Sequence, residues 1–496
     1  MSNFASLKIN LLIPELSLFA VIVFYLLAVL FIDHSNQKKI DVLLIVSLIF
    51  LGIFQLFNVG DISSQKAMNE MYVQDSLSNL LKGISTLLLS LLFIYSFKNT
   101  ETIGVTKSEF HLLSLFALLG QFIIISASHL ITIYLGIELL SLSLVSAVAL
   151  RRDSGNSSEA AMKYFVLAAL ASGFMLYGMS MLYGVTGSLE LVSISNQIVY
   201  ENDNIVLIFG LVFLLAGIGF KFGAVPFHMW VPDVYQGSSF STCMLIGAAP
   251  KLAAIALLLR LLVEGLPQLS QDWEKIFLLM GLFSVILGNF VAIAQKNLKR
   301  MLGYSTIGHV GFIFLAFGSS ILQQNSVSAI SAYSAAVFYV AIYSMTVTGV
   351  FGALLLINKG KDDMEEIDHL KGLMKENPLV SWCLVAFMFS MAGVPPAIGF
   401  YAKFVVLESL ISSNYFSLVV LAALSSVVGA FYYLRIIKVI VFDDTQENDV
   451  FFKESNIALV PKLLLTLNGV SIVVLGLFPS QIMNLFQYAI KNSLSF

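Results

Sequence analysis

The sequence predicts an all-α polytopic membrane protein with about 14 transmembrane helices. Of its 496 residues, 58% are hydrophobic and only 11% are charged, whereas a soluble domain keeps about a quarter of its residues charged. The mean hydropathy is +0.90, and apolar segments recur along the whole chain. Hydrocarbon cannot satisfy free backbone groups, so segments long enough to span it must be helical.

Fourteen segments are long and apolar enough to cross a bilayer. They lie near residues 11–31, 42–58, 75–97, 110–127, 129–150, 159–184, 204–227, 235–263, 275–295, 300–319, 330–357, 379–409, 414–441 and 458–481. The segments 129–150 and 235–263 have the least distinct boundaries because their connectors are short. Pro14 and Glu15 interrupt the first segment and no cleavage pattern follows it, so we expect a retained helix and not a signal peptide.

The connectors between these segments alternate in charge. One set is basic and carries Lys38, Lys39, Lys98, Lys107, Arg151, Arg152, Lys296, Lys299, Arg300, Lys359, Lys361, Lys371, Lys375, Lys453 and Lys462. The intervening set is neutral or acidic and carries Glu190, Glu201, Asp203, Glu264, Asp272 and Glu274. The positive-inside rule places the basic set on the cytoplasmic or matrix side. Without a transit-peptide pattern, we expect a bacterial inner membrane, with the mitochondrial inner membrane as the alternative.

A few ionisable side chains remain inside the predicted spans. They are Glu138, Lys163, Lys221, Lys251 and Lys403. Each would cost about 2.5–3.5 kcal/mol at a helix centre, so these groups must be paired, hydrated or partly neutral. Two structural interpretations stay open, because a lysine near a helix end can extend to the interface and an acid can serve only as a packing partner.

His309 lies in the apolar segment STIGHVGF. A histidine there is either a hydrogen-bonded core residue or a relay group, since imidazole exchanges protons near neutral pH.

Two of the predicted spans contain helix-breaking residues beside a lysine. Lys221 precedes Pro226 in a glycine-rich segment, and Lys403 follows Pro395 and Pro396. A proline removes one helical hydrogen bond and frees carbonyls, which in a membrane must meet water or protein. Interrupted helices at corresponding places in two halves indicate inverted repeats around a transport site.

The interrupted spans are the seventh and the twelfth, so they run in opposite directions. We therefore expect N-terminal helices at 1–109, a first five-helix repeat at 110–265, a second, inverted repeat at 266–442, and a C-terminal helix at 443–496. The broken helices fall near 217–230 and 391–403.

Several stretches together resemble the antiporter-like membrane subunits of respiratory complex I. They are LGIELLSL, EAAMKYFVLAALASGFMLYG, FKFGAVPFHMWVPDVYQGS, APK, KRMLGYSTIGHVGF and AGVPPAIGFYAKF, and they extend from about residue 110 to 442. Each is weak alone, but the set is specific. After Gly237 the family usually has a small residue and then proline, whereas this chain has Ser238, Ser239 and Phe240. This departure concerns the start of the eighth span.

The resemblance implies roles for the ionisable residues inside the spans. Glu138 and Lys221 would form the family's charge pair, Lys163 would modulate that pair, Lys251 would be the central relay, and Lys403 the terminal group. The lysine in the second broken helix and the short C-terminus look more like the shorter members of the family than the longer one, which adds a lateral helix.

The resemblance also implies the setting of the chain. It would move protons as a subunit of an NADH:quinone oxidoreductase, together with other membrane subunits and a peripheral redox arm in a lipid bilayer, without nucleic acid. NADH, FMN, iron–sulfur clusters and quinone would belong to the partner subunits. The chain itself has only Cys243 and Cys383, far apart, and no GxGxxG at a strand–helix turn.

The resulting hypothesis is a proton path halfway down the membrane between two half-channels. It runs through Glu138, Lys221, Lys251 and Lys403, with His309 nearby. A carboxylate about 7 Å from a lysine contributes about 2.4 kcal/mol at an effective dielectric of about 20. That is the order of the roughly 2.3 kcal/mol needed per proton against 100 mV. The alternatives are a subunit of a multi-subunit cation/proton antiporter or hydrogenase-linked pump, and a scaffold whose charges only lock helix packing.

Overall fold

The computed structural model describes residues 7–32, 36–60, 64–97, 107–198, 205–322, 325–358, 365–444 and 457–494. Six of the charged connector residues named above lie outside these ranges: Lys98, Glu201, Asp203, Lys359, Lys361 and Lys453. Within them the regular secondary structure is helical apart from one antiparallel hairpin, in which β1 (Gln65–Ala67) pairs with β2 (Tyr72–Gln74).

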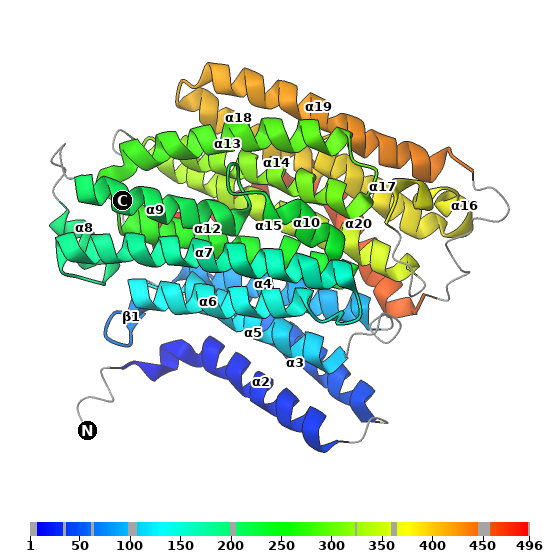
Figure 1. The fold of residues 1–496 in the computed structure, drawn as a ribbon, viewed down its shortest axis with the longest axis horizontal. Helices are drawn as coiled ribbons and strands as arrows, with labels where there is room; N and C mark the ends of the chain where they lie inside the picture. The colour runs from blue at the N-terminus through cyan, green and yellow to red at the C-terminus, as the bar shows by residue number, and fades with distance from the viewer. Residues whose placement is uncertain are drawn as a thin grey trace.

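The helices follow one another as long, nearly parallel rods (Figure 1). They are α2 (Ile13–Phe31), α3 (Gln37–Phe57), α4 (Ser76–Ser96), α5 (Lys107–Ile125), α6 (Leu130–Val148), α7 (Gly155–Thr186), α8 (Leu191–Gln197), α9 (Ile205–Phe222), α10 (Trp230–Gly237), α11 (Phe240–Gly247), α12 (Pro250–Leu258), α13 (Ser270–Ile293), α14 (Leu298–Gly318), α15 (Ser326–Ile357), α16 (Leu373–Glu376), α17 (Pro378–Ala392), α18 (Ile398–Ser412), α19 (Phe416–Val441), α20 (Leu459–Leu477) and α21 (Pro479–Ser493). Short 3₁₀ turns are η1 (Ile9–Leu12), η5 (Pro267–Leu269) and η6 (Ile367–Leu370), and η4 (Leu259–Glu264) is a π-helical turn.

The helices confirm the predicted membrane spans. Within the described residues, 13 helices are long and apolar enough to cross a membrane, and each matches one predicted segment. The remaining predicted span, 379–409, is the pair α17 and α18. One boundary was wrong: the eighth span begins at Phe240, with Ser239 as its N-cap, and residues 235–237 belong to the separate helix α10. The domain boundaries at 110, 266 and 443 stay predictions.

The connectors gather at two opposite ends of the bundle. At one end, contacts join Lys107 to Asp41, Arg152 to Glu109, and Leu298 to Glu365. At the other end, contacts join Val73 to Ser126, Leu130 to Leu189, and Leu77 to Ser493. We call the first, basic set the inner end and the second the outer end. In Figure 1 the inner end, with α16, lies at the right, and the outer end, with β1 and α8, lies at the left.

Two spans are interrupted near the middle of the bundle, as the prolines predicted. The helix α9 ends at Phe222, and Gly223 follows with a φ of +75°. The helix α17 ends at Ala392, and Gly393 follows with a φ of +81°. A left-handed glycine after the last helical residue is a common way to end a helix. Each break therefore leaves backbone carbonyls of a helix C-terminus without helical partners.

The C-terminal segment 443–496 was predicted as one helix, but its described part forms two. The helix α20 ends beside the second break, where Gly476 contacts Pro396. Pro479 then begins α21, which ends against the outer end of α4, where Ser493 accepts a hydrogen bond from Leu77. The two helices together cover the whole depth of the bundle.

Candidate functional site

Lys221 lies on the last turn of α9, directly before the first break. Its ammonium donates to the Ser141 hydroxyl of α6 at 2.7 Å. Glu138, one turn earlier on α6, lies near enough for an electrostatic interaction with Lys221. The Oε1 atom of Glu138 is buried and makes no hydrogen bond within the described part of the chain. Lys221 is thus held by Ser141, and Glu138 acts on it electrostatically without a direct ion pair among the described contacts.

Lys251 lies on α12 and shares a cavity with Lys221. The cavity measures about 40 Å³ and is lined by both lysines together with Ser141, Tyr164 and Trp230 among others. A water needs about 10–15 Å³ by this measure, so two or three waters can fit between the two amines. The Lys251 ammonium donates to the carbonyl of Phe222 at 2.5 Å, and the side chain is 3% exposed. Lys251 therefore donates a hydrogen bond to a carbonyl that has no helical partner because α9 ends at the first break.

Lys403 has the same arrangement at the second break. Its ammonium donates to the carbonyl of Ala392, the last residue of α17, and to the Ser426 hydroxyl of α19, both at 2.9 Å. The C-terminal end of a helix carries partial negative charge, which favours a cation. In both halves of the bundle, a broken helix thus supplies the acceptor that holds a lysine inside the protein.

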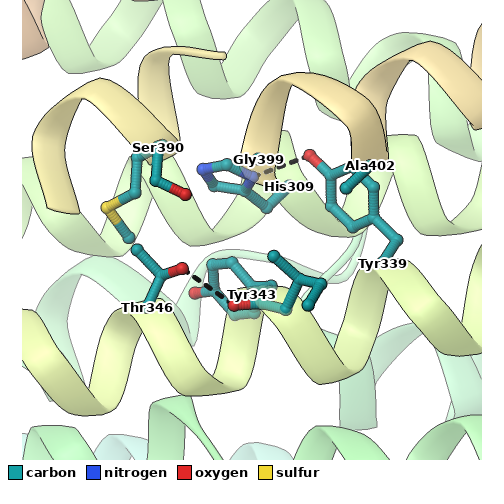
Figure 2. A pocket seen from close by; sticks show the side chains of 9 residues that line it. His309, Tyr339, Tyr343, Thr346, Ser390, Gly399 and Ala402 are labelled. Carbon is teal, nitrogen blue, oxygen red and sulfur yellow. Dashed lines mark hydrogen bonds between the residues drawn. The ribbon is translucent and has the colours of Figure 1, made fainter. Parts of the chain in front are cut away.

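His309 lies on α14, between the two lysines in chain order. Its Nδ1 is 2.8 Å from the Tyr339 hydroxyl and its Nε2 is 2.9 Å from the Tyr433 hydroxyl. Figure 2 shows the ring pointing at Tyr339, with Ser390 on its other side, in a small cavity of about 10 Å³ that Gly399 also lines. A hydroxyl can donate or accept, so both imidazole tautomers can be satisfied here. This permits a relay role without excluding a structural one.

Further hydroxyl groups surround His309, and no sequence pattern indicated them. They form three hydrogen-bonded pairs, which are Tyr433 with Ser305, Tyr343 with Thr306, and Thr306 with Tyr235. Ser344 donates to the Ala248 carbonyl at 3.0 Å, and the backbone N–H of Lys251 donates to the same carbonyl. The region between Lys251 and Lys403 is therefore lined with groups that can pass protons. Among the described residues no group of three or more His, Cys, Asp or Glu side chains is placed to hold a metal ion.

Lys163 is placed apart from the other predicted site residues. Its side chain is 46% exposed, and its ammonium lies 2.8 Å from both Glu159 and Asp233. Asp233, on α10, also binds Arg300 of α14 at 2.6 Å. Burial raises the pKa of the Asp233 carboxyl, but hydrogen bonds from Lys163 and Arg300 outweigh burial, so the pKa lies below its usual range. Lys163 thus anchors α10 at the inner end through Asp233.

Asp233→Asn is expected to lower the free energy of unfolding by about 1–3 kcal/mol, since it removes charge-assisted hydrogen bonds. The ionised Asp233 carboxylate stabilises the folded protein at pH values above the pKa that this group has in the unfolded chain. This stabilisation is lost as the pH falls through the lower pKa that the group has in the folded protein. Thermal unfolding of the purified complex in detergent at neutral and acidic pH measures both effects. The control is Asp443→Asn, whose partner Lys438 lies 3.4 Å away and is exposed, and which should change stability by less than about 1 kcal/mol. Equal effects of the two substitutions would contradict the anchoring role.

Comparison with known proteins agrees with the fold. The family described as "NADH:quinone oxidoreductase/Mrp antiporter, TM" matches residues 127–429. The chain therefore belongs to this family of antiporter-like membrane subunits. More particularly, it is 43% identical over 490 residues to NADH-quinone oxidoreductase subunit N of Herminiimonas arsenicoxydans, covering 97% of this chain and 98% of the relative.

Solved structures extend the comparison. A chain of respiratory complex I from Thermus thermophilus superposes with a TM-score of 0.80 at 28% identity, covering 96% of this chain and 100% of that one. A chain of the Mrp complex from Dietzia sp. DQ12-45-1b superposes with a TM-score of 0.83 at 16% identity, covering 98% of each chain. At 16% identity, the similarity to the Mrp chain shows only that the two chains share a fold.

Proposed function

We propose that this chain moves protons across a bacterial inner membrane as the subunit N of an NADH-quinone oxidoreductase, working with the other membrane subunits and the peripheral arm. The strongest support is the placement of Lys221 and Lys251 around one internal cavity, with Lys403 held at the second break. The chain supplies no redox centre in this proposal. NADH, FMN, iron–sulfur clusters and quinone belong to the partner subunits, and their reaction supplies the energy.

The proton path begins at Lys221. A proton that enters from the inner end is held at Lys221, where the Glu138 carboxylate favours the charged form. Movement or neutralisation of Glu138 weakens that preference, and the proton passes through waters in the shared cavity to Lys251. An interaction of about 2.4 kcal/mol at about 7 Å is of the order needed to move one proton against 100 mV.

The second half of the path runs from Lys251 to Lys403. The hydroxyls around His309 can exchange protons in either direction by rotation, because each donates and accepts. Lys403 then receives the proton at the Ala392 carbonyl and releases it toward the outer end. Both lysines lose a stabilising carbonyl contact if the broken helices shift, so movement at the breaks can change their proton affinity.

The rival function is that of a subunit in a multi-subunit cation/proton antiporter. The 43% identity with a subunit N over nearly the whole chain favours the oxidoreductase, whereas the Mrp complex shares only the fold. Redox subunits that co-purify in mild detergent would agree with the proposal. Small antiporter subunits in their place would overturn it.

Lys221→Ala is expected to lower proton pumping by the assembled complex about tenfold, equivalent to about 1.4 kcal/mol of barrier. The loss is incomplete because the enlarged cavity still admits water to Lys251. Glu138→Gln should have a smaller effect, since the lysine remains. The measurement is proton uptake into vesicles per NADH oxidised, with assembly checked by native gel. Full pumping in both variants would refute the assigned path.

A further inference from the structure

The small cavity beside His309 contains a polar group that the proposed path does not use. Ser390, on the last turn of α17, is 2% exposed, and its Oγ atom makes no hydrogen bond within the described part of the chain. Figure 2 shows the Ser390 hydroxyl next to the imidazole ring, on the side of the cavity. A buried hydroxyl without a partner costs stability, because it has given up the water that it binds in the unfolded chain. Ser390 thus lacks the partner that a buried polar group normally has.

The cavity has the size and the lining of a site for one water molecule. It measures about 10 Å³. The polar residues that line it are His309, Tyr339, Tyr343, Thr346 and Ser390. A water needs about 10–15 Å³ by this measure and two to four polar partners. The hydroxyls of Tyr343 and Thr346 donate to other groups, so each oxygen keeps a lone pair that can accept a hydrogen bond from a water.

Gly399 keeps the space beside the Ser390 hydroxyl open. It lies on the first turn of α18 and lines the same cavity. A Cβ at this position would lie 2.7 Å from the Ser390 Oγ atom, which is closer than two such atoms can approach without a shift. Any side chain at position 399 would therefore occupy the room that a partner of the hydroxyl needs.

The cavity lies between His309 and Lys403. The imidazole and the Lys403 ammonium are near enough for an electrostatic interaction. The ammonium also lies 5.5 Å from the centre of the Phe312 ring, which is one turn after His309 on α14. Ala402, the neighbour of Lys403 in the chain, lines the cavity together with His309. The space at Ser390 is thus at the point where the relay hydroxyls approach the terminal lysine.

Direct hydrogen bonds do not bridge this point among the described residues. Lys403 donates to the Ala392 carbonyl and to Ser426, and neither group belongs to the hydroxyls around His309. Both nitrogens of His309 bind tyrosine hydroxyls, and one of these, Tyr339, lines the cavity. A proton that reaches Tyr339 therefore needs one more carrier before it reaches Lys403.

We propose that the cavity holds one water molecule bound by Ser390, and that this water carries the proton from Tyr339 to Lys403. Protonated His309 gives its Nδ1 proton to the Tyr339 oxygen while Tyr339 gives its hydroxyl proton to the water. The water gives one of its own protons to the neutral Lys403 amine, so Tyr339 and the water end with the protons that they had at the start. Ser390 is a positioning residue that holds the water and keeps its own proton. The transfer rests on the proposed function, whereas the water site does not.

The first measurement is a high-resolution electron microscopy map of the assembled complex. A water should appear about 3 Å from the Ser390 Oγ atom and should be absent from the map of the Ser390→Ala variant. That variant should also lower the rate of proton uptake into vesicles about fivefold, equivalent to about 1 kcal/mol of barrier. The hydroxyl makes no hydrogen bond with the described part of the protein, so thermal unfolding of the complex should be nearly unchanged. A loss of pumping at unchanged stability is not expected of a purely structural serine.

The matched control is Ser172→Ala on α7. Ser172 is also a buried serine whose hydroxyl makes no hydrogen bond within the described part of the chain. It lines neither the cavity at His309 nor the cavity at Lys221 and Lys251. Ser172→Ala should therefore pump at the rate of the unchanged protein.

The water site would be overturned by a map of the unchanged complex that resolves water in the Lys221–Lys251 cavity but none at Ser390. This map decides the site even if Ser390→Ala does not assemble. Normal pumping by Ser390→Ala, or an equal loss in Ser172→Ala, would overturn the transfer through the water. Lys403→Met separates the two proposals, because normal pumping by that variant refutes the proton path, whereas the map at Ser390 concerns the water site alone.

Discussion

Lys251→Met is expected to reduce proton pumping by the assembled complex at least about a hundredfold, which corresponds to roughly 2.7 kcal/mol of barrier. Methionine has a similar length and suits a buried apolar site, so the fold should remain intact. It cannot accept a proton, however, and the lysine that lines the cavity opposite Lys221 is lost. A charge that must cross apolar surroundings without a carrier costs several kcal/mol.

Proton uptake and NADH:quinone turnover measured together test this expectation. The matched control is Lys375→Met at the inner end, whose side chain is 72% exposed and pairs with Asp444 at 2.6 Å. An exposed ion pair contributes little, so this control should pump within about twofold of the unchanged protein. Normal pumping with Lys251→Met in an assembled complex would remove Lys251 from the path. Equal losses in both variants would point to a general defect.

The membrane spans and the buried lysines could be predicted because both carry strong sequence signals. An apolar segment of about 20 residues has few structural options in a bilayer. A charge inside it is costly, so Lys221, Lys251 and Lys403 stand out without any structural knowledge. Proline and glycine beside Lys221 and Lys403 then located both breaks.

The hydrogen-bond and ion-pair partners of these ionisable residues could not be predicted from the sequence. Lys163 was expected to modulate the pair of Glu138 and Lys221, yet its partner Asp233 is 70 residues away on α10. The connector between α9 and α11 contains α10, and α10 packs against α7, which brings Asp233 to Lys163. The sequence around either residue does not predict this contact. Glu138 and Lys221 were expected as a charge pair, but the hydroxyl that accepts the hydrogen bond of Lys221, on Ser141, was not foreseen. Partner choice depends on how helices pack, which the sequence of a single helix does not encode.

The hydroxyl groups around His309 left no sequence signal either. Serine and threonine are ordinary in membrane helices, since their hydroxyls can donate to a carbonyl of the preceding turn, as Thr306 does to Leu302. Tyrosine is common at membrane interfaces. Only the packing of α14, α15 and α19 shows that Tyr339 and Tyr433 face the same imidazole. Arg260, which is buried against Asp75 and Glu264, was likewise not predicted, because an arginine at the end of a predicted span suggests an interface and not a buried ion pair.

The broken helices connect the predictable part of the site to the unpredictable part. Proline and glycine explain why α9 and α17 end inside the bundle, but only the structure shows that the freed carbonyls of Phe222 and Ala392 bind Lys251 and Lys403. The position of Lys251 therefore depends on how closely α12 approaches α9, and that of Lys403 on how closely the two halves of the second broken helix approach. In the second break, this distance is set by Gly399 of α18 packed against the backbone of Ser390 of α17.

Gly399→Ala is expected to lower the free energy of unfolding by about 3 kcal/mol or more and to reduce pumping about tenfold. A Cβ at this position would collide with the Ser390 carbonyl oxygen and lie 2.7 Å from the Ser390 hydroxyl. Backbone cannot rotate away as a side chain can, so α18 must move from α17. Lys403, one turn later, would then lose the Ala392 carbonyl at 2.9 Å.

Thermal unfolding and proton uptake of the assembled complex measure the two effects of Gly399→Ala. The control is Gly184→Ala on α7, where an added Cβ meets nothing within 4 Å and alanine favours the helix by up to about 1 kcal/mol. It should leave pumping unchanged and stability equal or slightly higher. If Gly399→Ala behaved like this control, the approach of the two half-helices would not position Lys403, and the symmetry between the two breaks would have no consequence for proton release. A loss of both stability and pumping confined to Gly399→Ala would tie the terminal lysine to the geometry of the break, since the substitution changes no ionisable group.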